Sequence, residues 1–408
     1  MPIQGLSQVL ASKLDEMQQA GRLKGNETII RAVVPPAGGK GRRYLLEGEG
    51  EQSFLRMNSN SYLGMSLRTE VIAAEEDAVR RYGSGPGAVR FISGTWGSHT
   101  ALERRLAEFH GRDAVMLFSC AYATMMGVLP SLITAKTAVI SDELNHSCII
   151  NAIALARPAE KHIYRHLDMA DLERGLAAAG KTCRRAIIVT DGIFSMRGDH
   201  APLDRIQTLA QQYDAGFPEN VIVLVDDSHG VGAFGGSGRG TEEFTGSGPC
   251  DVLVGTLGKA FGVNGGYVAG AATIIRYLRE TSPFYVYSNP ITPAEAAAAQ
   301  KAVELVDGPV GLGLLLHLRA MTARFKAGLV RLGFETLAGE HPVVPLMLRD
   351  TARTSALVAH LRRCGILATG LNYPVVPKGE EEIRFQISAD HAPADIDEAL
   401  DALRRFGG

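Results

Sequence analysis

The chain has 408 residues, of which 46% are hydrophobic, and this length suffices for a large core and a second, smaller domain. Its 42 basic and 44 acidic residues leave a formal net charge of -2, so no basic excess indicates a nucleic acid or an anionic membrane as partner. The five cysteines are odd in number, widely spaced and without a C-x-x-C pair. This pattern argues against a disulfide framework or a zinc site and favours a reducing cytosol.

Residues 1–55 are expected to form an N-terminal arm, which contains a predicted helix over residues 6–19 and a Pro/Gly-rich stretch over residues 35–39. The first 17 residues lack the basic start, apolar core and cleavage site of a signal peptide. We therefore expect a cytoplasmic protein.

One uncharged run, residues 114–135, is long enough to span a bilayer. It contains Ser119, Cys120 and Pro130, so it is not uniformly apolar. We expect a buried strand, a turn and a helix here, with a membrane span as the alternative.

The chain from residue 56 to 300 alternates between short apolar runs and helical patterns, which predicts one large domain. Short all-apolar strands between helices are typical of a mostly parallel sheet covered by helices on both faces. An alanine-rich helix over residues 293–306 is expected to lead out of this domain. The expected strands are 114–118, 137–140, 186–190, 221–225 and 252–256, and the helices between them include 99–109, 169–179 and 203–213.

Residues 301–408 are expected to form a smaller C-terminal α+β domain. In an open parallel sheet, ligands bind beyond the carboxyl ends of the strands, so residues just after the large-domain strands are the first candidates for function. The elements expected in the small domain are helix 314–332, strand 343–348, helix 353–364, strand 383–387 and helix 394–406.

Lys259 is a lone lysine among small and apolar residues just past the expected strand 252–256. Burial lowers the pKa of a lysine and makes its amine able to form an imine with an aldehyde. Thr256 and the neighbouring glycines would present a hydroxyl and backbone N–H groups to a phosphate. The alternative is a surface lysine in a glycine turn. The segment does not match G-x-x-x-x-G-K-[ST], which argues against a nucleoside-triphosphate loop.

Asp226 follows the all-apolar strand 221–225 and precedes Asp227 and His229. A carboxylate at a buried strand end needs a cationic or hydrogen-bonding partner. The protonated pyridine nitrogen of pyridoxal 5′-phosphate (PLP) is such a partner, and the pairing keeps the ring an electron sink. His229 would hydrogen-bond the ring oxygen or orient the carboxylate. The alternatives are a metal site made of all three side chains, or a helix N-cap at Asp227.

A third candidate region follows the expected strand 114–118, where a helical run begins near Ala121 and Tyr122. Backbone N–H groups at a helix start suit a phosphate. Tyr122 and His146 each offer a ring that would stack on the cofactor. The alternatives are a core aromatic residue and a histidine satisfied by hydrogen bonds.

Arg384 lies inside the apolar strand 383–387, where an unpaired charge is costly. The carboxylate of a substrate would pair with it in a bidentate geometry, worth roughly 1.5–3 kcal/mol. The alternative is an internal salt bridge. Asn60 is by default a turn residue, and Ser288 with Asn289 would by default cap a turn.

In combination these residues resemble the α-oxoamine synthase family of fold-type I PLP enzymes, over nearly the whole chain. The chain is most similar to the branch that condenses glycine with acetyl-CoA, on the stretches 89–95, 373–379 and 383–391. The family motifs are Asn60-x-Tyr62-Leu63-Gly64, Ser93-Gly94-Thr95, Asp142-x-x-Asn145-His146, Asp191-Gly192-x-Phe194-Ser195-Met196-x-Gly198, Asp226-Asp227-Ser228-His229-Gly230, Thr256-x-Gly258-Lys259 and Pro374-x-x-Pro377-x-Gly379.

The resemblance implies a role for each residue around the cofactor ring. Lys259 would hold PLP as an imine and later move the α-proton of the substrate. Asp226 would pair with the pyridine nitrogen, while His229 and Ser195 would lie near the ring oxygen. His146 would stack on the ring and so also contact the substrate.

The resemblance also implies how the phosphate is held. The backbone of Ala121 and Tyr122, with Thr256, would bind it within one subunit. Ser288 and Asn289 would reach the phosphate of the other subunit's cofactor, so a homodimer with a shared active site is expected.

The resemblance finally implies the reaction. Arg384 and Asn60 would grip the carboxylate of glycine, which is joined to acetyl-CoA to give 2-amino-3-oxobutanoate and CoA. A decarboxylating relative that uses alanine, serine or glycine with a longer acyl-CoA is the nearest rival, because Pro86 and its neighbouring glycines depart from the closest branch. Two further hypotheses are a PLP-free metal hydrolase built on Asp226, Asp227 and His229, and a non-catalytic subunit of an oxoamine synthase.

Overall fold

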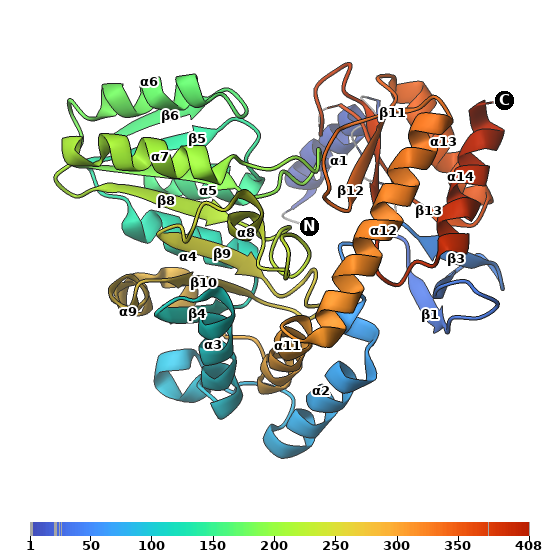
Figure 1. Ribbon diagram of the computed structural model, residues 1–408, viewed down its shortest axis with the longest axis horizontal. Helices are drawn as coiled ribbons and strands as arrows, with labels where there is room; N and C mark the ends of the chain where they lie inside the picture. Colours follow the sequence, from blue (N-terminus) through green and yellow to red (C-terminus); the bar gives the residue numbers. More distant parts are fainter. Residues whose placement is uncertain (1–2, 20–22, 24, 26, 374, 408) are drawn as a thin grey trace.

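The computed structural model describes residues 3–19, 23, 25, 27–373 and 375–407. Pro374, which belongs to one of the motifs above, lies outside the described residues. Figure 1 shows a large sheet flanked by helices, next to a smaller body that contains the C-terminal helix. No helix in the described ranges combines the length and the apolar character needed to cross a membrane.

The large sheet has seven strands in the order β4-β10-β9-β8-β7-β5-β6. Only β10 runs antiparallel to its neighbours, β4 and β9, and the other neighbouring pairs are parallel. The expected mostly parallel sheet is therefore confirmed. Its strands are β4 (Ala114–Phe118), β5 (Thr137–Asp142), β6 (Glu160–Tyr164), β7 (Arg185–Asp191), β8 (Val221–Asp226), β9 (Val252–Thr256) and β10 (Gly266–Gly270).

Both faces of this sheet are buried, because alternate residues of a strand point to opposite sides. On β5, Val139 joins one hydrophobic cluster, while Ala138 and Ile140 join the other. Helices cover the two clusters, as expected for a parallel sheet. The helices are α2 (Thr69–Tyr82), α3 (Gly97–His110), α4 (Ala121–Leu132), α5 (Ser147–Ala156), α6 (Met169–Ala179), α7 (Leu203–Tyr213), α8 (Thr241–Thr245), α9 (Ala272–Thr281), α10 (Pro283–Val286) and α11 (Pro293–Val306).

The uncharged run of residues 114–135 forms β4, a two-residue turn and then α4. The strand is hydrogen-bonded to β10 along its whole length. The prediction of a buried strand, a turn and a helix is confirmed.

The smaller body is built on a second sheet with the order β11-β12-β15-β14. Figure 1 shows α12 running along this body from the α11 end toward β11. Its elements are α12 (Pro309–Arg331), β11 (Glu335–Thr336), β12 (Val343–Met347), α13 (Thr351–Arg363), β13 (Ile366–Leu367), β14 (Thr369–Leu371), β15 (Glu382–Gln386) and α14 (Pro393–Gly407).

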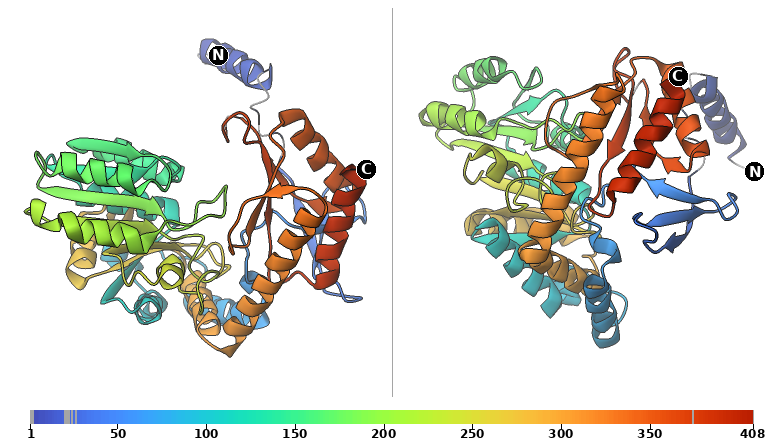
Figure 2. Two further views of the ribbon diagram at one scale, coloured as in Figure 1. Left: turned by 45° about the horizontal axis from the view of Figure 1, so that its top comes forward. Right: turned by 45° about the vertical axis from the view of Figure 1, so that its right-hand side comes forward.

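Part of the expected N-terminal arm joins the C-terminal body. Strand β3 pairs in parallel with β13, so residues near the two ends of the chain share a sheet. Helix α1 (Gln4–Gln19) has no buried residue and stands apart from the rest in Figure 2. The domain limits at residues 55 and 300 stay a prediction. The remaining strands of this sheet are β1 (Ile30–Val34), β2 (Arg43–Leu46) and β3 (Ser53–Arg56).

A charged histidine ties the end of β5 to the loop that follows β7. The ring of His166 contacts Asp142 through Nδ1 at 3.0 Å and Asp199 through Nε2 at 3.2 Å. Burial alone lowers the pKa of His166, but the hydrogen bonds to the two carboxylates raise it to about 9. The charged ring therefore stabilises the folded protein fully below its unfolded pKa of 6.5, and this contribution is lost as pH rises through about 9.

The variant His166→Gln is expected to lower the melting temperature most near pH 6, where the ring of His166 is charged and pairs with two carboxylates. The effect should be least near pH 9.5, where the ring is largely neutral and these pairs are already weakened. Thermal unfolding of both proteins across this pH range measures the difference. His162→Gln is the control, since His162 is more exposed and contacts a single carboxylate, that of Asp171. A loss that is equal at every pH would contradict the expectation.

Candidate active site

A cavity lies at the carboxyl ends of the large-sheet strands, where the sequence predicted the site. It gathers side chains from the ends of β7 and β8, from the turn after β9 and from the starts of α4 and α5. The structure thus brings together seven of the residues expected from the sequence. The cavity is lined by Ala121, Tyr122, His146, Cys148, Asp191, Ile193, Ser195, Asp226, Ser228, His229 and Lys259.

Lys259 occupies a tight turn three residues after β9. Its carbonyl accepts a hydrogen bond from Gly262 N at 3.0 Å. Gly262 has φ +72°, and a Cβ there would lie 2.4 Å from the backbone nitrogen of Ser66, so only glycine fits. Burial lowers the pKa of Lys259 to about 8, although the charges of Asp226 and Asp191 oppose the shift. The amine is therefore poised to act as a nucleophile near neutral pH.

Asp226 is the last residue of β8 and is only 6% exposed. Its Oδ1 accepts from Ser228 N at 3.1 Å, and the one described group near its Oδ2 is the thiol of Cys148, at 3.5 Å. Asp191 lies next to it on β7, and burial, helped by the charge of Asp226, raises the pKa of Asp191 well above its usual value. Asp226 is thus the carboxylate with an oxygen free for a cation in the cavity.

His146 is held at the start of α5 with a defined ring orientation. Its Nδ1 accepts from the backbone nitrogen of Cys148 at 3.2 Å, and its own backbone nitrogen donates to Asp191 Oδ2 at 3.0 Å. Burial lowers the pKa of His146, so the ring is neutral at physiological pH. A neutral ring that is held by a hydrogen bond at one edge and lines the cavity is suited to stack on a flat cofactor.

The start of α4 supplies backbone donors. Cys120 is the N-cap, and within the described residues the N–H groups of Ala121 and Tyr122 donate to no protein acceptor. The first N–H groups of a helix attract anions. Gly266 lets β10 lie close to the start of α4, because a Cβ at that position would be 2.4 Å from Ala121 N. This helix start fits the phosphate of the cofactor.

Three residues expected at the phosphate do not line this cavity. The Thr256 hydroxyl is 3.2 Å from the carbonyl oxygen of Gly265, to which it donates. Ser288 is half-buried and Asn289 is exposed, just after α10. Ser288 and Asn289 do not line the cavity of their own chain, so their contact with a phosphate stays a prediction.

Arg384 reaches the site from β15 of the small body. Its Nη1 donates to the carbonyl oxygen of Ser195 at 3.0 Å, and its buried Nε has no partner. Within the described residues it forms no ion pair, so the alternative of an internal salt bridge is wrong. Burial raises the pKa of the nearby Glu382 carboxyl to about 8, so this group stays largely protonated at neutral pH. Arg384 therefore keeps its charge for an anionic ligand.

Asn60 is tied to the same strand, because its Oδ1 accepts from Nε2 of Gln386, two residues after Arg384 on β15. Neither Asn60 nor Arg384 lines the cavity itself. The amide NH₂ of Asn60 is then directed elsewhere. The two residues expected to grip a substrate carboxylate are thus brought together by a strand and by the turn before Tyr62.

The metal alternative fails on the position of Asp227. Its carboxylate accepts from Thr241 N at 2.7 Å and Thr241 Oγ1 at 2.6 Å, and it does not line the cavity. Burial raises its pKa to about 7. Across the ranges the structure describes, no group of three His, Cys, Asp or Glu side chains is arranged to hold a metal ion.

Sequence reasoning assigned no site role to Asp191, Cys148 or Tyr62. Asp191 did carry a signal, since it follows a predicted strand within a family motif. Cys148 was noted only as one of five widely spaced cysteines, and Tyr62 only as part of the motif Asn60-x-Tyr62-Leu63-Gly64. The contact of Tyr62 with His229 joins positions far apart in the chain and has no local signature.

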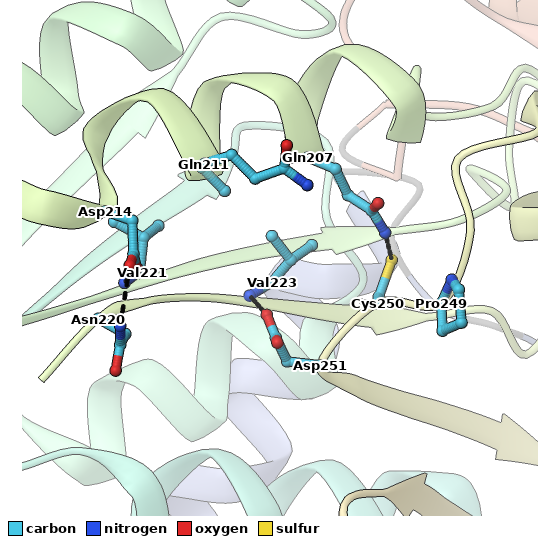
Figure 3. A pocket seen from close by; sticks show the side chains of 10 residues that line it. Gln207, Gln211, Asp214, Asn220, Val221, Val223, Pro249, Cys250 and Asp251 are labelled. Atoms are coloured by element: carbon cyan, nitrogen blue, oxygen red, sulfur yellow. Dashed lines mark hydrogen bonds between the residues drawn. The ribbon is translucent and has the colours of Figure 1, made fainter.

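A larger cavity lies at the opposite, amino ends of β8 and β9 (Figure 3). Its polar groups are used by the fold: Asp251 accepts from Val223 N at 2.8 Å, and Gln207 donates to the sulfur of Cys250 at 3.2 Å. It contains none of the residues expected in the site.

Comparisons with known proteins agree with this geometry. The model of the family "Aminotransferase class I and II" matches residues 52–403. Human mitochondrial 2-amino-3-ketobutyrate coenzyme A ligase is 38% identical over 98% of this chain and 91% of its own length. The 8-amino-7-oxononanoate synthase of Thermosipho melanesiensis is 37% identical over 98% and 97%. Serine palmitoyltransferase of Sphingomonas wittichii has a TM-score of 0.88 at 25% identity, over 99% of this chain and 98% of its own.

The fold and the site together define a fold-type I PLP-dependent transferase, and the expected fold class and cofactor are confirmed. The chain belongs to the aminotransferase class I and II family, among its α-oxoamine synthases.

The residues present fit this cofactor. Lys259 offers an amine with a lowered pKa, Asp226 offers an underused carboxylate oxygen, and the α4 start offers unpartnered N–H groups. PLP, with an aldehyde, a basic ring nitrogen and a phosphate, matches these three features one by one.

The rate at which cofactor-free protein captures PLP is expected to rise with pH and to level off above about pH 8, because the neutral amine of Lys259 reacts. Stopped-flow visible absorbance measures this rate. Lys259→Ala should capture no PLP covalently, whereas Lys301→Ala, at a half-exposed lysine paired with Glu304, should match the parent. A rate that climbs to about pH 10.5, the ordinary value, would contradict the buried amine.

Proposed function

We propose that the protein is a glycine C-acetyltransferase that condenses glycine with acetyl-CoA to 2-amino-3-oxobutanoate and CoA. The observation that carries this proposal is the 38% identity to human 2-amino-3-ketobutyrate coenzyme A ligase over 98% of the chain. The stretches 89–95, 373–379 and 383–391, which follow that branch of the family, support it. The product would be released as the β-keto acid, in threonine and glycine metabolism.

Arg384 orients the amino acid. Its Nε, which has no partner among the described residues, and its Nη2 form a fork that binds the substrate carboxylate in a bidentate way, while Nη1 donates to the Ser195 carbonyl. With Asn60 beside it, this contact fixes which bond of the α-carbon faces Lys259. The small body thereby positions the substrate, while the large sheet holds the cofactor.

Lys259 moves the proton. Bound PLP acts as an electron sink that stabilises negative charge on the α-carbon. The amine of Lys259, with a pKa of about 8, takes the α-proton, and the carbon then attacks the thioester carbonyl and CoA leaves. His146, which lines the cavity, would stack on the ring of bound PLP and exclude water from it.

We infer a homodimer in which each subunit completes the other's site. Ser288 is half-buried and Asn289 exposed in the single chain, and the adjoining Tyr287 is 80% exposed. A large exposed aromatic side chain is typical of an interface. The cytoplasmic location stays a prediction.

A second candidate is a decarboxylating condensation with a longer acyl thioester. It is favoured by the 37% identity to 8-amino-7-oxononanoate synthase, which nearly equals the identity to the ligase. Phe91 and Ile92 are each 64% exposed and follow closely on the glycine-rich loop at Pro86. Apolar residues there would suit a longer chain.

A matrix of thioesters and amino acids separates the two functions. Acetyl-, hexanoyl-, pimeloyl- and palmitoyl-CoA are each combined with glycine, alanine and serine, and CoA release and CO₂ release are measured together. We expect the highest kcat/KM with glycine and acetyl-CoA, without stoichiometric CO₂. Preferred use of a longer thioester with equimolar CO₂ would establish the second candidate, and no CoA release with any pair would overturn both.

Arg384→Lys is expected to raise KM for glycine about 10- to 100-fold, because an ammonium group cannot replace a bidentate fork worth roughly 1.5–3 kcal/mol. KM for acetyl-CoA should change little. Arg324→Lys is the control, since Arg324 is exposed and pairs only with Asp397. Equal effects on KM for both substrates would show that Arg384 does not bind the carboxylate.

A further inference from the structure

A buried tyrosine outside the cavity contacts His229, one of the two histidines that line it. The hydroxyl of Tyr62, a residue with 0% exposure, lies 2.7 Å from Nδ1 of His229. The two residues are 167 positions apart in the chain. His341 completes a group of three buried rings, with its centroid 5.4 Å from that of Tyr62 and 6.3 Å from that of His229. None of the three contacts was expected from the sequence.

The direction of the Tyr62–His229 hydrogen bond follows from the protonation of Tyr62 and from the distances to the acceptors around its hydroxyl. Burial raises the pKa of Tyr62 far above its ordinary value, so its oxygen keeps its proton. The nearer acceptor is Nδ1 of His229 at 2.7 Å, whereas the other, Asn60 Oδ1, lies 3.4 Å away, beyond the usual length of a hydroxyl hydrogen bond. The Tyr62 proton is therefore donated to Nδ1 of His229.

The protonation of His229 is then fixed. Burial, followed by the charge of Lys259 and then His341, Arg384 and His146, lowers the pKa of His229 well below its ordinary value, so the ring is neutral. A neutral imidazole that accepts at Nδ1 carries its proton on Nε2. Nε2 has no hydrogen-bond partner among the described residues, and His229 lines the cavity of Lys259.

His341 holds the backbone of the same residue. Its Nε2 donates to the carbonyl oxygen of His229 at 2.9 Å, and its Nδ1 accepts from Val343 N at 3.1 Å. Burial lowers the pKa of His341 to about 3, so it too is neutral, and its two contacts require one tautomer. The His229 ring and backbone are thus held from two separate segments of the chain.

We propose that Tyr62 is a positioning residue that fixes the orientation and tautomer of His229, so that Nε2–H points into the cavity as a donor to the ring oxygen of PLP. This inference rests on the proposed function only in requiring PLP at the site, and it applies equally to either acyl thioester. Tyr62 would act through His229, because Tyr62 itself does not line the cavity.

Tyr62→Phe removes one buried hydroxyl and leaves Nδ1 of His229 without a donor. The chain offers a matched control, Tyr267→Phe, because Tyr267 is equally buried and its hydroxyl lies 2.8 Å from Nε2 of His110, a second buried pair outside the cavity. Any general cost of deleting a buried tyrosine–histidine hydrogen bond appears in both variants.

The first readout is the tautomer, measured without cofactor or substrate. Magic-angle-spinning NMR of 15N-histidine-labelled parent protein, assigned with His229→Gln, should show His229 protonated at Nε2 only. In Tyr62→Phe this single form should give way to a mixture, and in Tyr267→Phe it should persist. A parent protein with the proton on Nδ1 would overturn the proposal even if Tyr62→Phe failed to fold.

The second readout is the visible absorption of the PLP-loaded enzyme as a function of pH. Losing a well-aligned donor to the ring oxygen destabilises the deprotonated chromophore, so Tyr62→Phe should raise the titration midpoint by about 0.5–1 pH unit. Tyr267→Phe should leave it within about 0.2 unit of the parent. Equal midpoints in all three proteins would overturn the proposal. Failure of the proposed function would instead appear as absent CoA release with both readouts as expected.

Discussion

The structure depends on burying an ammonium group and two carboxylates within one cavity at the carboxyl end of a parallel sheet. Charges removed from water are costly unless they are paired or neutralised. Burial lowers the pKa of Lys259 to about 8 and raises that of Asp191 well above its usual value, so each group is shifted toward its neutral form. Asp226 meanwhile retains an oxygen with only a thiol beside it. A cofactor that forms an imine with Lys259 and carries a cationic ring nitrogen beside Asp226 would offset the cost of burying the amine and the cost of burying the carboxylate.

The topology explains how distant residues reach this cavity. Parallel strands β5, β7, β8 and β9 all end at the same edge, so Asp191, Asp226 and Lys259 meet there although they span nearly 70 positions. The small body adds contacts from the other side: Arg384 donates to the Ser195 carbonyl and His341 to the His229 carbonyl. The residues proposed to hold the cofactor and those proposed to hold the substrate therefore come from different parts of the chain.

Much of the large domain could be predicted, because its signals are local. The bounds of β4 and β9 agree with the predicted strands, and those of α6, α7 and α11 with the predicted helices, since apolar periodicity marks their limits. Strand β10 was not predicted because glycines at both of its ends, Gly266 and Gly270, shorten its apolar run. Strand β6 was not predicted because exposed and partly buried residues alternate along it at the edge of the sheet. Lys259 and Asp226 stood out by following buried strands. The link from Tyr62 to His229 depends on tertiary contacts and was not predictable.

We propose that the amine of Lys259 and the carboxylate of Asp226 hold one PLP molecule between them. Borohydride reduction of the purified enzyme, followed by peptide mass mapping, tests it most directly. We expect a single phosphopyridoxyl group on the peptide that contains Lys259, and its loss from most molecules when Asp226→Ala protein is treated in the same way. A group attached to another lysine, or no attached group in the parent protein, would show that Lys259 does not hold the cofactor.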